Sequence, residues 1–141
     1  DASPNVKLDF EWIDKRTRDD WPFDLSAYFQ PGKYDVVILG DLDSAALSRE
    51  QWQALADRVW EGTGLLMMGG FHSFGPGGYH RTPLAKVLPL RMGRLERQRF
   101  EDPISADLHL PGPVKIRPSK LFGTHPIMHL AKGPENLVQW L

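Results

Sequence analysis

The spacing of apolar and polar residues predicts three strands and one helix in the first half of the chain. Apolar and charged residues alternate through residues 6–12, a period of two that is typical of a half-buried strand. Residues 34–40 form a nearly continuous apolar run instead, which predicts a strand that is buried on both faces and parallel to its neighbours. A second short apolar run covers residues 65–68.

Between the two apolar runs, the sequence predicts one helix. Ser48 and Gln51 have the spacing of a capping box, in which each side chain accepts a hydrogen bond from the other residue's backbone N–H. The apolar residues that follow recur at the spacing of one helical face, namely Trp52, Leu55, Ala56 and Val59. Gly62 and Gly64 are expected to end the helix. Strand, helix and strand with tight connections predict a right-handed βαβ unit, and hence an α/β fold with a mainly parallel sheet.

The second half of the chain is expected to be rich in loops, because residues 69–141 hold nine glycines and nine prolines. We expect a short helix at residues 82–88, with Pro83 at its first position. Short strands are predicted at residues 90–93, 107–110 and 114–117, and a helical turn at 125–130.

Composition narrows the classes of partner and of chemistry. The 141 residues, with 41% hydrophobic positions, are expected to form a single domain over residues 1–141. The net charge of −1 argues against nucleic acid or an anionic membrane as the main partner, and no apolar run is long enough for membrane insertion. The absence of cysteine excludes disulfides, thiolate metal sites and a cysteine nucleophile. No cofactor and no resident metal are expected.

The best candidate site lies where the two apolar strands end, because ligands of open α/β sheets bind at the carboxyl ends of the strands. The loops after the two strands are expected at the same edge of the sheet. The ligand-binding candidates on these loops are Asp41, Asp43, Gly69, Gly70, His72, Ser73, Gly77, Gly78 and His80. Asp41 and Asp43 are equally compatible with ligand contacts and with capping of the turn into the helix.

We call the two loops at this edge, residues 40–44 and 69–80, the rim. Each catalytic interpretation of the rim has a structural alternative. Ser73 is a weak candidate nucleophile, but the glycine two residues before the serine of a nucleophile elbow is missing. His72 is a weak candidate too, since sequence neighbours rarely have the geometry of nucleophile and base, so His80, His125 or His129 would have to supply the base. A loop-capping hydroxyl is favoured for Ser73. His125 and His129 have a four-residue metal-ligand spacing and could join the aspartates, yet Pro126 pushes His125 out of helical geometry. Residues 75–78 could cradle an anion, although a plain tight loop is favoured.

Residues 34–43, the predicted helix, and residues 64–79, 82–84 and 88–89 resemble the class I glutamine amidotransferase-like family. Residues 125–127 with Asn136 and Trp140 are similar to its C-terminal segment. The resemblance implies a flavodoxin-like, doubly wound, mainly parallel sheet with helices on both faces. It also implies that the chain is a truncated domain of a larger bacterial protein, and many such proteins are membrane-anchored. The compartment is left open, with the cytoplasmic part of a membrane-anchored protein as one option.

The chain departs from that family at the nucleophile. The amidotransferase cysteine would follow the strand at residues 65–68, where Gly69 and Gly70 stand instead. Since thiol chemistry needs a thiolate, we expect a catalytically inactive module that binds a small molecule or a protein. The alternative is a hydrolase or transferase that uses Ser73 with a histidine, or a His/Asp metal site, at the same rim. If the first strand of the sheet is missing, the exposed sheet edge is expected to be covered, for example in a homodimer.

Overall fold

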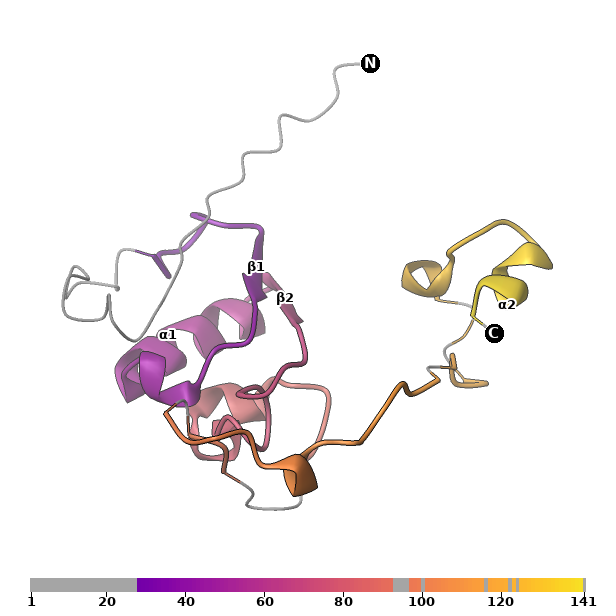
Figure 1. Cartoon of the computed structure of the whole chain (residues 1–141). Coiled ribbons are helices and arrows are strands. Elements are labelled where there is room, and N and C mark those ends of the chain that lie inside the picture. Colours follow the sequence, from indigo (N-terminus) through magenta and orange to yellow (C-terminus); the bar gives the residue numbers. More distant parts are fainter. Residues whose placement is uncertain are drawn as a thin grey trace. The chain divides into compact units, whose positions relative to one another are not determined.

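A computed structural model describes residues 28–92, 97–99, 101–115, 117–121, 123 and 125–140 of the chain (Figure 1). These residues belong to two compact units, one within Asp1–Leu108 and the other within His109–Leu141. The strand predicted at residues 6–12 lies outside the described residues.

The first unit is built on a strand–helix–strand motif. It consists of β1 (Val36–Leu39), α1 (Arg49–Trp60) and β2 (Gly64–Met67). The strands are parallel neighbours, with Val36 opposite Gly64 and Leu39 opposite Met67. The predicted order of elements and their parallel pairing are therefore confirmed.

Helix α1 begins and ends where the local sequence predicts. The Gln51 N–H donates to Ser48 Oγ at 3.3 Å, and the Ser48 N–H donates to Gln51 Oε1 at 2.6 Å, which completes the capping box. The helix ends at Trp60, with Glu61 as its C-terminal cap, and Gly62 then takes a positive φ of 117°. Glycine suits this position because it carries no Cβ.

The predicted apolar stripe of α1 forms the centre of the core. Trp52, Leu55 and Ala56 are buried against residues from β1 and from the loops. The other buried apolar members of the core are Leu39, Leu47, Tyr79 and Leu84. Trp52 and Tyr79 meet edge to face, with their ring centroids 5.2 Å apart. Helix and rim therefore share one core, which makes the positions of the loops dependent on the packing of α1.

One face of the sheet packs on this core and the other is open. Val37, Leu65 and Met67 pack against the core. Val36 and Ile38 point the other way and are 57% and 58% exposed. The prediction that the first strand is buried on both faces is therefore wrong, because nothing in the described chain forms a second layer over that face.

The prediction of a doubly wound, flavodoxin-like sheet with helices on both faces is also wrong. In the described residues the sheet has two short strands, and one helix, α1, covers one of its faces. The described parts of 90–93, 107–110 and 114–117 form no strand. The physical reason is the density of proline, which supplies no N–H to a ladder and so disfavours central strands.

Two of the short helical turns beyond β2 lie where the sequence predicts helical structure. Pro83–Lys86 is a 3₁₀-helix with proline in its first turn, close to the short helix predicted at 82–88. In the second unit, Pro126–Met128 forms the predicted helical turn. His125 before it is extended, as expected of a residue that precedes proline. The five-residue helix α2 (Glu135–Gln139) follows near the end of that unit.

Candidate functional site

The fold brings the two predicted loops together at the carboxyl edge of the sheet. Because β1 and β2 are parallel neighbours, the loops that follow them leave the sheet at the same edge. Asp41, two residues beyond the end of β1, contacts residues 71–73 of the loop after β2. The expectation that Asp41 and His72 share one rim is confirmed by these contacts.

The carboxylate of Asp41 holds the second loop in place. Its Oδ1 accepts hydrogen bonds from the His72 N–H at 2.7 Å and from Ser73 Oγ at 3.3 Å. Its Oδ2 accepts from the Phe71 N–H at 3.1 Å and lies 3.3 Å from His72 Nδ1. A carboxylate has about four acceptor positions, so these four groups leave little capacity for a ligand. The geometry thus gives Asp41 a positioning role.

These contacts shift the ionisation of Asp41. Burial by itself raises the pKa of this carboxyl, but the hydrogen bonds and charge of His72, with the hydrogen bond from Phe71, outweigh burial and bring the pKa below its ordinary value of 3.8. The folded chain therefore binds this proton less tightly than the unfolded chain. The resulting stabilisation is present above the unfolded pKa and is lost as the pH falls through the lower folded pKa.

We expect Asp41→Asn to lower the free energy of unfolding by about 1 kcal/mol at neutral pH, a modest value because water screens this partly exposed carboxylate. The difference from the wild type should shrink as the pH falls below about 4, where the wild-type carboxyl becomes protonated. Urea unfolding followed by circular dichroism at several pH values measures both effects. Asp57→Asn, at an exposed position of α1, is the matched control. A difference between Asp41→Asn and the wild type that does not change with pH would contradict this role.

Ser73 does not have the surroundings of a nucleophile. Its side chain is buried, with 1% exposure, and its hydroxyl donates to Asp41 Oδ1. An attacking hydroxyl needs both a base and access to substrate, and burial removes that access. The geometry matches the loop-capping alternative.

The glycine-rich loop is closed by its own hydrogen bonds. The N–H groups of Gly77, Gly78 and Tyr79 donate to carbonyls of residues 73, 75 and 74 at 2.9–3.2 Å. These N–H groups are therefore not directed at an anion, which favours the tight-loop alternative.

Three of the candidate glycines leave no space for a side chain. A Cβ at Gly70 would lie 2.3 Å from Asp41 Cγ, one at Gly77 would lie 1.8 Å from the His72 carbonyl oxygen, and one at Gly78 would lie 2.9 Å from Ser44 Oγ.

Asp43 joins the rim to a more distant segment. Its buried carboxylate accepts from the Ala45 N–H at 2.7 Å, which caps the 3₁₀-helix Ser44–Ala46. It also forms a bidentate ion pair with Arg97, with nitrogen–oxygen distances of 2.6 and 2.7 Å. Arg97 Nη1 in turn donates to the Pro76 carbonyl at 3.1 Å. Both carboxylate oxygens of Asp43 therefore already accept hydrogen bonds from groups within the protein.

The sequence did not single out Arg97 or Gln98 as part of this rim. Gln98 is 2% exposed; its amide nitrogen donates to three carbonyls, and its amide oxygen accepts from the Ser105 N–H. The arginines at 91, 94, 97 and 99 are interleaved with acidic residues at 96, 101 and 102, a pattern typical of a solvated face. The ion pair joins residues 54 positions apart, and no local pattern carries that information.

Tyr79 contacts the rim, and three further candidate histidines remain, namely His80, His125 and His129. The Tyr79 hydroxyl donates to the Leu42 carbonyl at 2.7 Å, and burial, with the charges of Asp43 and Asp41, raises the pKa of this tyrosine. His80 Nε2 accepts from Arg81 Nε at 3.1 Å. His125 and His129 belong to the second unit, where His125 Nδ1 accepts from the Ile127 N–H. Within the described ranges, no three histidine or acidic side chains gather as a metal site would require.

Fold and rim together define a small α/β domain built on one βαβ unit. The chain matches no protein-family model, no curated protein and no solved structure. The resemblance to the glutamine amidotransferase-like family therefore stays a prediction. Of the helices that the structure describes, none combines the length and apolar character needed to cross a bilayer.

Proposed function

We propose that this chain is a non-catalytic protein-interaction module and that its contact surface is the open face of the two-stranded sheet. We use "open face" for the side chains of Val36, Ile38, Leu66 and Met68. Val36 and Ile38 come from β1, and Leu66 and Met68 follow the same alternation along β2 and just beyond its end. The exposure of this face is the observation that carries the proposal.

The open face is apolar, continuous and uncharged. Its four side chains are 48–58% exposed, and Leu66 lies directly opposite Ile38 in the strand register. Together they leave an apolar area on the order of a few hundred Å², the size at which a patch on a soluble protein marks an interaction site. A charged ligand would lose hydration here without finding a counter-charge, so an apolar protein surface fits better.

A second copy of this chain is the partner that the open face suits best. Two copies related by a two-fold axis would bring identical patches together, and the patch contains no charge that would repel its own copy. Face-to-face packing of sheets at about 10 Å would bury side chains from both copies. An interface of this size falls in the weak class below about 1,200 Å², so the association should be reversible and depend on concentration.

The chemistry of the rim supports a role without catalysis. Cysteine is absent, Ser73 is buried, and the carboxylates of Asp41 and Asp43 accept hydrogen bonds from the protein itself. Rigid loops on a small scaffold are suited to presenting a surface. Release of ammonia from L-glutamine by the purified chain would contradict this part of the proposal.

We expect Ile38→Lys to weaken self-association at least about tenfold, because it places a charge in the middle of an apolar interface. The fold should persist, since residue 38 is exposed and a lysine in a strand costs less than about 1 kcal/mol. Analytical ultracentrifugation of the full chain over a range of concentrations measures the association.

The matched control is Trp60→Lys, which makes the same kind of change at a residue that is 82% exposed on α1, away from the open face. It should associate like the wild type. A wild-type chain that stays monomeric at every concentration, or an Ile38→Lys variant that associates as strongly as the wild type, would overturn the proposed surface.

A further inference from the structure

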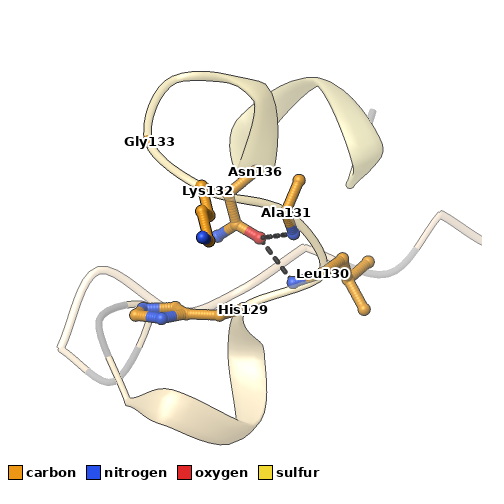
Figure 2. Close-up of a pocket in the computed structure, with 6 residues that line it drawn as sticks. All are labelled: His129, Leu130, Ala131, Lys132, Gly133 and Asn136. Atoms are coloured by element: carbon orange, nitrogen blue, oxygen red, sulfur yellow. Dashed lines mark hydrogen bonds between the residues drawn. The ribbon is translucent and has the colours of Figure 1, made fainter.

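The second unit contains a pocket that the sequence did not predict. It has a volume of about 570 Å³ and lies between the 3₁₀-helix Pro126–Met128 and α2 (Figure 2). The lining residues are His129, Leu130, Ala131, Lys132, Gly133 and Asn136. Three of the six carry side chains able to donate hydrogen bonds, and none of these lining residues is acidic.

The hydrogen bonds of Asn136 determine which way its amide points. Its Oδ1 accepts from the Leu130 N–H at 2.7 Å and from the Ala131 N–H at 3.2 Å. The reversed amide would set a donor against two donors, so the orientation is fixed by the network. The Nδ2 group therefore turns away from these two N–H groups, as Figure 2 shows.

Two further donor side chains line the same pocket. Lys132 carries a cationic ammonium, and Figure 2 shows its side chain on the same side of the loop as the Asn136 amide nitrogen. The imidazole ring of His129 lies below them in this view. An amide donor in a fixed orientation and an ammonium group can together bind the oxygens of a carboxylate or a phosphate. Hydrogen bonds from an ammonium group to such an anion are charge-assisted, and they are stronger than hydrogen bonds between neutral groups.

We propose that this pocket binds a small oxyanion, whose oxygens accept hydrogen bonds from Asn136 Nδ2 and Lys132 Nζ. A carboxylate and a phosphate share this chemistry. All residues of this site belong to the second unit, whereas the residues of the open face and of the rim belong to the first. The result of an anion-binding experiment at this pocket therefore does not decide whether the chain is an interaction module.

The test is a nitrogen–proton correlation NMR titration of the full chain. Inorganic phosphate and acetate are added in separate experiments, with sodium chloride adjusted to keep the ionic strength constant. We expect saturable shifts of the Asn136 side-chain amide and of the backbone amides at residues 129–133 with at least one of the two anions. The anion that gives the lower dissociation constant identifies the preferred oxyanion.

Asn136→Asp is the most informative variant. It retains the Oδ1 acceptor for Leu130 and Ala131 but replaces the Nδ2 donor with an anionic oxygen, so anion binding should weaken at least about tenfold. Lys132→Gln should also weaken binding, whereas Lys120→Gln, an exposed lysine outside the pocket, should leave the dissociation constant unchanged.

Either of two results would overturn the proposal. One is shifts in the wild type that grow linearly with both anions, or that sodium chloride alone reproduces. The other is a Lys132→Gln variant whose dissociation constant equals that of Lys120→Gln. The comparison of Lys132→Gln with Lys120→Gln tests anion binding at the pocket even if Asn136→Asp disturbs the loop.

Discussion

Replacing Gly77 by alanine is expected to lower the free energy of unfolding by about 3 kcal/mol or more, which is among the largest effects that a single substitution produces. An added Cβ would lie 1.8 Å from the carbonyl oxygen of His72 and 3.0 Å from Cε2 of the buried Tyr79 ring. The first neighbour is backbone, so no side-chain rotation relieves the clash. The loop would have to move, and residues 71–73 would lose their contacts with Asp41.

Gly69→Ala is the matched control for this prediction. Gly69 precedes the same loop and is exposed, and a Cβ there would meet nothing within 4 Å. Its effect on stability should stay within about 1 kcal/mol, and reduced freedom of the unfolded chain could make it stabilising. Urea unfolding of both variants, followed by circular dichroism, gives the comparison. Equal midpoints for Gly77→Ala and Gly69→Ala would show that the loop is not packed as described.

Trp52→Ala is expected to cost about 3–5 kcal/mol, the range for truncating a large buried aromatic side chain. Trp52 is 1% exposed, its ring meets Tyr79 edge to face, and its Nε1 donates to the Ser44 carbonyl at 2.8 Å. The variant would leave a cavity beneath the rim and a carbonyl without this donor. The free energy of unfolding of a small domain is only about 5–15 kcal/mol, so this loss would remove a large part of the stability of the first unit.

Trp60→Ala makes the same change on the same helix and serves as the control. Because Trp60 is 82% exposed, the expected change is no more than about 0.5 kcal/mol. Thermal unfolding of the two variants beside the wild type measures the difference. The tertiary packing described above would be contradicted if Trp60→Ala cost as much as Trp52→Ala.

The parts of the fold that could be predicted from sequence are those set by neighbouring residues. Ser48 and Gln51 stand three residues apart, so their mutual capping depends only on the local backbone. The spacing of the apolar residues in α1 indicated which side of the helix is buried, because the helical period places Trp52, Leu55 and Ala56 on one face. Two apolar runs with a helix between them favour parallel pairing, which the structure contains.

The apolar runs did not reveal how many layers the sheet would have. A strand with an uninterrupted apolar run, such as residues 36–39, can be buried on two faces or can leave one face open. The residue types of the strand do not reveal which other elements pack against it. The prediction of helices on both faces failed for this reason. It extended a correct local motif to a whole sheet, although the later segments are too rich in proline to supply strands.

The sequence by itself determined the capped helix, the two strands with their parallel order, the edge at which Asp41 and His72 meet, and the absence of thiol chemistry. Each of these follows from residue identity or from spacings of a few residues. Only the tertiary structure decided that Asp43 pairs with Arg97, that Ser73 is buried, that one sheet face stays open and that Asn136 turns its amide nitrogen away from residues 130 and 131. Those features depend on long-range contacts and on which surfaces find a partner, and neither is encoded in a local pattern.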